Sequence, residues 1–143
     1  MNDNLDDFVN QLQDKINTEA KGVLGDQGFE RWQNPKYRGK IQGFNAHGRI
    51  TGVCGDTMEL FLKIENDLVI DASYLTDGCG TSNVCGSFAA EMTIGKTFNE
   101  LPQISGEAIL GRLGTVPQEE QHCAFLAAST IQEALDDYMK TKI

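Results

Sequence analysis

The apolar residues of this chain change their spacing once, at Gly80, and this change limits the folds open to it. Residues 57–64 alternate between apolar and largely polar side chains, which is the period-2 pattern of a half-buried strand. After Gly80 apolar residues recur every three or four positions, which is typical of helices. Strands followed by helices predict an α+β domain in which helices pack on one face of an antiparallel sheet.

The strand region predicts a three-stranded antiparallel meander. Residues 65–67 are typical of a turn, and residues 69–76 predict the strand that returns from it. A shorter strand over residues 49–54 precedes residues 57–64 and completes the sheet. In the returning strand, the side chains expected to share one face are Ile70, Ala72 and Tyr74.

Two helical segments are expected before the sheet. Residues 5–24 carry apolar side chains at the spacing of an amphipathic helix. A shorter helical piece over residues 29–33 contains Trp32, which is expected to serve packing. Residues 36–48 are rich in glycine, and this composition predicts an irregular loop with a solvated His47.

Three helices are expected after the sheet. The first covers residues 81–94, with Thr81 or Ser82 as its N-cap. The second is a short helix over residues 105–113, which lies between glycines. The third covers residues 115–140 and is capped by its first residue, a threonine.

The charge and cysteine content of the chain limit its partners and its compartment. The net charge of −9 over 143 residues argues against a nucleic-acid role, because few cations are available to neutralise phosphates. No segment approaches the roughly 20 apolar residues of a membrane span, and no signal peptide is visible, so a cytoplasmic location is expected. Thiols stay reduced there, so the four cysteines are expected to serve metal binding or catalysis rather than disulfides.

Three of these cysteines stand alone, each beside a glycine or another potential ligand. Cys54 precedes a glycine, Cys79 lies between two glycines, and Cys123 directly follows His122. None belongs to a C-x-x-C pair, which argues against the common zinc-finger and thioredoxin motifs. The fourth, Cys85, lies among apolar residues and is expected in the core, with a role as a further thiolate ligand as the alternative.

Isolated thiols in such settings predict one metal site gathered from distant loops. Cys79 and Cys123 are expected near helix starts, where the positive end of the helix dipole favours the thiolate. Thiolates select zinc, copper(I) or iron–sulfur clusters, whereas the carboxylate of Asp56, two residues after Cys54, is a harder and weaker ligand. Three thiolates with Asp56 or His122 would leave one position exchangeable, unlike a structural site closed by four strong ligands.

The sequence around these cysteines resembles one family, the iron–sulfur cluster assembly scaffolds of the IscU type and the N-terminal domain of NifU. The resemblance rests on Gly-Val-Cys-Gly-Asp-Thr-Met at residues 52–58, Gly-Cys-Gly-Thr-Ser at 78–82 and His-Cys at 122–123. Residues 91–97, which end in Gly-Lys-Thr, and Trp-Gln-Asn-Pro at 32–35 are also similar to segments of that family.

The resemblance implies a scaffold, not an enzyme, on which a [2Fe–2S] cluster is assembled and then handed to apo-acceptor proteins. It implies a cysteine desulfurase that delivers sulfur as a persulfide onto Cys123, together with an iron donor and an electron donor. It implies Cys54, Cys79 and Cys123 as thiolate ligands, Asp56 as the carboxylate that keeps the site labile, and His122 as an alternative ligand. Zn²⁺ is expected to bind in the same site.

Three departures refine that expectation. Val-Pro-Gln-Glu-Glu at residues 116–120 stands where the family has Leu-Pro-Pro-Val-Lys, which argues against recognition by an HscA-type chaperone. The long insertion of the SufU branch is absent between Cys79 and Cys123, which favours scaffolding over zinc-dependent sulfur transfer. An N-terminal helical extension, residues 1–28, precedes the scaffold domain, residues 29–143, and is a candidate for dimerisation into a homodimer.

Two other functions fit a three-cysteine site and are kept as alternatives. A zinc-dependent sulfurtransferase would accept a persulfide and pass it on, and it would hold zinc tightly. A structural zinc domain would carry no transfer chemistry, and removal of zinc would unfold it.

Overall fold

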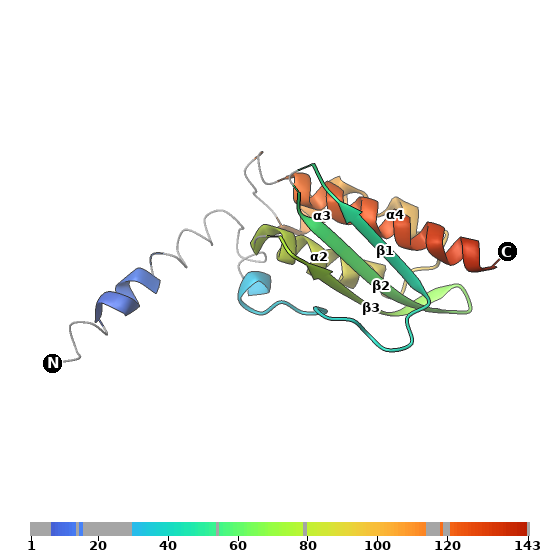
Figure 1. The fold of residues 1–143 in the computed structure, drawn as a ribbon, viewed down its shortest axis with the longest axis horizontal. Coiled ribbons are helices and arrows are strands. Elements are labelled where there is room, and N and C mark those ends of the chain that lie inside the picture. The colour runs from blue at the N-terminus through green and yellow to red at the C-terminus, as the bar shows by residue number, and fades with distance from the viewer. Residues whose placement is uncertain are drawn as a thin grey trace.

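The computed structural model describes residues 7–13, 15, 30–53, 55–78, 80–113, 118 and 121–142 of this chain. From residue 46 onwards, three strands are followed by the helices (Figure 1). This order confirms the α+β fold that the change of period at Gly80 predicts.

The sheet is an antiparallel meander in which β2 lies between β1 and β3. The strands are β1 (Ala46–Thr51), β2 (Thr57–Glu65) and β3 (Leu68–Thr76). β1 begins earlier than predicted, since Ala46 already pairs with Leu62 of β2. Residues 46–48 therefore belong to the sheet and not to the irregular loop that the glycine content predicts.

A β-bulge in β3 makes the predicted face of Ile70 wrong. The register between the strands shifts near Ile64, which lies opposite Val69. The extra residue turns Ile70 outward, so that it is 41% exposed, and Val69 takes the buried position. Ala72 and Tyr74 face the core as predicted.

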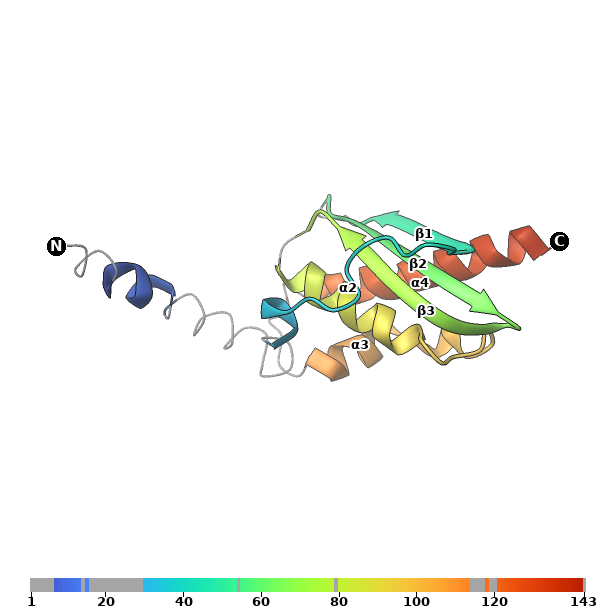
Figure 2. The ribbon, with the colours of Figure 1, turned by 90° about the horizontal axis from the view of Figure 1, so that it is seen from below.

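The helices pack on one face of the sheet, in agreement with the prediction. They are α2 (Gly80–Thr93), the 3₁₀ helix η1 (Leu101–Gln103), α3 (Gly106–Leu113) and α4 (His122–Lys142). α2 lies over β3 and α4 lies over β1 and β2, while α3 packs against both helices (Figure 2). The core lies between this helical layer and the buried side of the sheet.

Two of the predicted helix starts differ from the structure. α2 begins at Gly80, so Thr81 and Ser82 lie in its first turn and are not its N-cap. The hydroxyl of Ser82 makes contacts with other segments, described below, instead of capping the helix. α4 begins at His122, and the predicted cap Thr115 lies outside the described residues.

The contact between α4 and β1 depends on a glycine in β1. A Cβ atom at Gly48 would lie 2.7 Å from the backbone nitrogen of Ala134 and still closer to the carbonyl oxygen of Thr130. Both atoms belong to the α4 backbone, which cannot yield as a flexible side chain does. Glycine at this position therefore lets α4 lie directly on the sheet, and His47 N–H donates to Asp137 Oδ2 of α4 at 3.0 Å.

Tyr74 joins β3 to α2 in the centre of the core. Its ring is fully buried and lies against Gly86, where a Cβ would come 2.5 Å from the ring. Its hydroxyl donates to Asn83 Oδ1 at 3.3 Å. Burial raises the pKa of Tyr74, so its hydroxyl stays protonated and keeps this hydrogen bond.

The other face of the sheet is partly covered by the segment that leads into β1. Tyr74 N–H donates to the Tyr37 carbonyl and Gly39 N–H donates to the Tyr74 carbonyl, so this segment protects the edge of β3.

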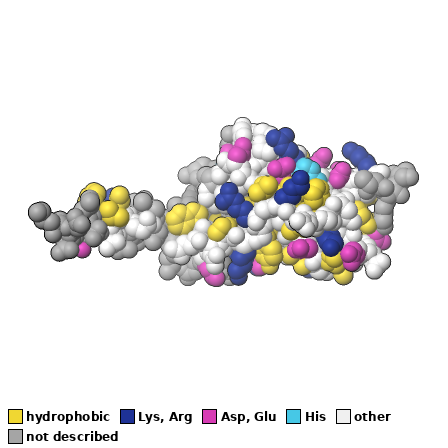
Figure 3. Space-filling model, turned by 60° about the horizontal axis from the view of Figure 1, so that its bottom comes forward, with side chains coloured by type: hydrophobic (Ala, Val, Ile, Leu, Met, Phe, Trp, Pro, Cys, Tyr) yellow, Lys and Arg dark blue, Asp and Glu magenta, His cyan; other side chains and the backbone are white. Residues whose placement is uncertain are grey.

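His47 was predicted to be solvated, but its ring stacks on Phe61 with centroids 4.9 Å apart, and its Nε2 lies 3.0 Å from Glu59 Oε1. Charged side chains of both signs lie interspersed on the face shown in Figure 3.

The short helical piece before the sheet is held against α2 by Arg31. Its guanidinium lies 4.3 Å from the centroid of the Phe88 ring and 3.1 Å from Glu91 Oε2. Arg112 of α3 pairs with the same carboxylate at 2.7 Å. Residues 30–33, the described part of the predicted piece, are helical and fixed to α2 and α3 through this shared ion pair.

Residues 7–13 and 15, the described part of the predicted N-terminal helix, are helical. The apolar side chains Phe8, Val9 and Leu12 are 62%, 52% and 49% exposed. Within the described residues, no helix combines the length and the apolar character needed to cross a membrane.

The replacement Gly48→Ala is expected to destabilise the domain by about 3 kcal/mol, the upper end of the cost of overpacking, because the new methyl group meets the α4 backbone. Gly111→Ala is the matched control. Gly111 lies in α3, is exposed and has no atom within 4 Å of an added Cβ, so helix propensity should stabilise the domain by about 0.5–1 kcal/mol. Urea unfolding measures both changes. Equal stability of Gly48→Ala and the parent would contradict the close packing of α4 on β1.

Candidate metal centre

The fold brings Asp56, His122 and Cys123 together at one end of the sheet. One ligand atom from each residue, a carboxylate oxygen, an imidazole nitrogen and the sulfur, lies within 4.8 Å of the others. Asp56 lies in the connection between β1 and β2, and the other two residues form the start of α4. These three types of side chain are ligands of Zn²⁺ and of other divalent transition metals.

A tight turn positions Asp56. Gly55 N–H donates to the carbonyl of Gly52 at 3.0 Å, and Gly52 N–H donates to the carbonyl of Asp56 at 2.8 Å. Gly55 has φ +87°, a left-handed conformation in which a side chain would be strained. The turn therefore presents the half-buried carboxylate of Asp56 just before β2 begins.

Cys123 lies in the first turn of α4 and is fully buried. The positive end of the helix dipole at this position favours an anionic sulfur. The Nε2 atom of the half-buried His122 lies 3.5 Å from Cys123 Sγ. The predicted neighbourhood of His122 and Cys123 at a helix start is thus present, although the helix begins later than predicted.

Ser82 was expected only as a helix cap, but the structure places it at this centre. Its Oγ lies 3.2 Å from Cys123 Sγ, and its hydroxyl donates to Asp56 Oδ2 at 3.3 Å. The sequence held one signal for this position. Ser82 ends the Gly-Cys-Gly-Thr-Ser segment at residues 78–82, which contains the candidate ligand Cys79.

The other two predicted ligands, Cys54 and Cys79, lie outside the described residues. Their described neighbours adjoin the centre. A Cβ atom at Gly78 would lie 2.9 Å from Asp56 Oδ2 and 2.6 Å from Ser82 Oγ.

Cys85 is fully buried in the core and is not among the described residues that form this centre, which confirms its interpretation as a core residue.

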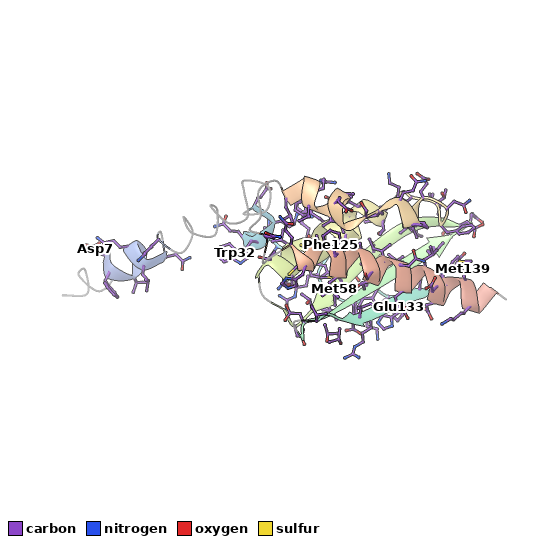
Figure 4. All side chains as sticks on the ribbon, turned by 90° about the horizontal axis from the view of Figure 1, so that it is seen from above. Asp7, Trp32, Met58, Phe125, Glu133 and Met139 are labelled. Carbon is purple, nitrogen blue, oxygen red and sulfur yellow. The ribbon has the colours of Figure 1, made fainter. Side chains whose placement is uncertain are left out.

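Trp32 lies beside the start of α2. A Cβ atom at Gly80 would come 2.6 Å from Trp32 Nε1, so the indole packs directly on the first residue of the helix. The prediction that Trp32 serves packing is confirmed, since the side chain also lies against the core. Figure 4 shows Trp32 and Phe125 toward one end of the domain and Met139 at the other.

An apolar groove of about 280 Å³ borders the centre. Val53 on one side is fully exposed and Phe125 on the other is 44% exposed. The lining residues come from the end of β1, the turn after it and the start of α4: Ile50, Thr51, Gly52, Val53, His122, Phe125, Leu126 and Ser129. The candidate centre therefore opens beside an exposed apolar surface.

Comparison with known proteins gives matches over most of the chain. A family model described as the NifU-like N terminal domain matches residues 25–143. The iron-sulfur cluster assembly scaffold protein IscU 1 of Archaeoglobus fulgidus is 34% identical over 119 residues, which are 82% of this chain and 78% of that protein. Iron sulfur cluster assembly protein 1 of Trachipleistophora hominis is 38% identical over 117 residues, which are 78% of this chain and 83% of that protein.

A solved structure supports the fold. The crystal structure of the N-terminal part of a nitrogen-fixing NifU-like protein from Brucella abortus superposes with a TM-score of 0.65. The match covers 84% of this chain and 96% of that one at 16% sequence identity, so it speaks to the fold alone.

The centre is expected to bind Co²⁺ as a spectroscopic probe for divalent metals, with a sulfur-to-metal charge-transfer band from Cys123. Cys123→Ser should weaken this band, because one of the sulfurs expected at the centre is removed. Cys85→Ala is the matched control and should retain the band, because Cys85 lies in the core. Loss of the band in Cys85→Ala but not in Cys123→Ser would contradict this assignment.

Proposed function

Because this chain belongs to the family of NifU-like N-terminal domains, we propose that it is a scaffold for iron–sulfur cluster assembly that passes its cluster to apo-acceptor proteins. The observation that carries the proposal is the grouping of Asp56, His122 and Cys123, which come from the β1–β2 connection and from the start of α4. A scaffold binds and releases its cargo without turning over a substrate, so the chain is not an enzyme.

The cargo is a [2Fe–2S] cluster, held by Cys54, Cys79 and Cys123 with Asp56 as the fourth ligand and His122 as the alternative. Thiolates are the usual protein ligands of such clusters. Support comes from the contact of the Asp56 carboxylate with the same Ser82 hydroxyl that meets the sulfur of Cys123. A carboxylate binds these soft centres more weakly than a thiolate, which suits a site that must give up its cargo.

Cys123 is the residue that receives sulfur. A cysteine desulfurase presents a persulfide, and the thiolate of Cys123 attacks its outer sulfur. A new S–S bond forms on Cys123, and the donor's cysteine leaves as a thiolate. Because Cys123 is fully buried, this step requires the residues around it to move when the donor binds. The donor is expected to bind at the apolar groove beside His122, because the side chains of Val53 and Phe125 are exposed there.

The remaining partners follow from the chemistry of assembly. An iron donor supplies the metal, and an electron donor reduces the persulfide sulfur to sulfide. Residues 116–120 lack the sequence that an HscA-type chaperone recognises in the family, so release does not depend on that chaperone. The cytoplasmic location, the homodimer and the division into residues 1–28 and 29–143 stay predictions from the sequence.

A zinc-dependent sulfurtransferase is the second candidate. One carboxylate, one imidazole and one thiol within 4.8 Å of one another form a donor set that suits Zn²⁺. Such a protein would hold stoichiometric zinc, stimulate desulfurase turnover and fail to hold iron. A structural zinc domain would instead unfold when zinc is removed.

Anaerobic reconstitution tests the scaffold function. Incubation of the chain with iron, cysteine, a reductant and a desulfurase should produce the visible absorption of a [2Fe–2S] cluster, with iron and sulfide in equal amounts. Transfer of that absorption to an apo-ferredoxin completes the test. Zinc that persists under these conditions, with no iron taken up, would favour the sulfurtransferase.

Asp56→Ala is expected to slow the loss of the cluster to an apo-acceptor several-fold, because the weak, exchangeable ligand is removed. The measurement is the rate at which the acceptor's absorption appears. Asp136→Ala is the matched control, since Asp136 is exposed on α4 and bonds to Gln132. Transfer from Asp56→Ala at the parent rate or faster would contradict the role of Asp56.

A further inference from the structure

Ser82 is a buried polar residue at the centre whose role the sequence does not indicate. It lies in the first turn of α2 and none of its surface is exposed. Its Oγ lies between the Asp56 carboxylate at 3.3 Å and the Cys123 sulfur at 3.2 Å. The hydroxyl therefore touches two candidate ligands that lie far apart in the sequence.

We propose that Ser82 is a positioning residue. Its buried hydroxyl holds the Asp56 carboxylate and the Cys123 sulfur at the relative position that one bound ion or cluster requires. The hydroxyl meets atoms of the β1–β2 connection and of α4, so it ties three separate segments at one point. This inference rests on the proposed function only in taking Asp56 and Cys123 as ligands.

The chemistry of a hydroxyl suits a site that is alternately filled and emptied. A serine hydroxyl offers one donor hydrogen and two acceptor lone pairs. When the sulfur carries a proton, Ser82 accepts from Cys123 and donates to Asp56, so both contacts are satisfied. When the sulfur binds a metal, the same hydrogen can turn to the sulfur. An alanine would satisfy neither partner in either state, and a buried polar group without a partner is costly.

The surroundings of Ser82 keep its hydroxyl in place. Gly78 lies so close that a Cβ there would come 2.6 Å from Ser82 Oγ and 2.7 Å from Ser82 Cβ. The hydroxyl is thus confined by the neighbouring backbone on one side and by its two hydrogen-bond partners on the other. A fixed donor of this kind orients ligands and strengthens metal binding.

Two effects on a bound metal follow. Outer partners of metal ligands typically contribute about 10–100-fold in affinity, so removal of the hydroxyl weakens binding. A hydrogen bond to a ligating sulfur also stabilises the reduced, more negative state of a cluster, so its removal lowers the reduction potential. A merely structural serine would produce neither effect.

The test is Co²⁺ titration of the metal-free chain, followed by the charge-transfer band. Ser82→Ala is expected to weaken Co²⁺ binding about tenfold or more relative to the parent. Ser87→Ala is the matched control, because Ser87 is equally buried on α2 but bonds to Arg31 and to the Lys36 carbonyl, away from the centre. Its Co²⁺ affinity should equal that of the parent. Urea unfolding without metal separates any loss of folding from loss of affinity.

A double-mutant cycle with Asp56→Ala gives the second measurement. If Ser82 acts by holding Asp56 and Cys123, its replacement costs less affinity in the Asp56→Ala background than in the parent. The reduction potential of the reconstituted cluster should also be lower in Ser82→Ala than in Ser87→Ala.

The outcomes separate this inference from the proposed function. Equal Co²⁺ affinity of Ser82→Ala and the parent overturns the role of Ser82 and leaves the scaffold proposal standing. Losses that simply add in the double variant also overturn it. Absence of Co²⁺ binding by the parent overturns the ligand assignment and this inference together.

Discussion

The site depends on the direct packing of α4 against β1. Gly48 leaves no side chain between the strand and the helix backbone, and Asp137 of α4 accepts a hydrogen bond from the neighbouring backbone of β1. Since β1 ends in the turn that presents Asp56, fixing α4 on β1 also fixes the start of α4, and with it Cys123. A packing contact in the middle of the domain thus sets the distance between ligands at its end.

The composition of the centre suits temporary binding. It combines a buried sulfur with a half-buried carboxylate and imidazole, so that strong and weak ligands meet at one place. A site closed by four thiolates would hold its metal more firmly. In the metal-free site the Ser82 hydroxyl can accept from a protonated Cys123 while it donates to Asp56, so emptying the site leaves neither of these two groups unpaired.

Local periodicity predicted the sheet, the helical layer and the place of Cys123 at a helix start, because each depends on residues close together in the sequence. Ile70 was placed wrongly because a bulge depends on the pairing with β2, which periodicity within one strand does not contain. His47 was placed wrongly because its partners Phe61 and Glu59 lie on the next strand. For Ser82 the sequence predicts only a cap, because its two partners come from distant segments. The ligand roles of Cys54 and Cys79 stay predictions.

Native mass spectrometry of the cluster-loaded chain, before and after addition of an apo-acceptor, tests the central claim most directly. The account predicts a mass increase equal to two irons and two sulfides on this chain, which moves to the acceptor as a unit when the proteins are mixed. A mass increase of one zinc that stays on this chain throughout would contradict it.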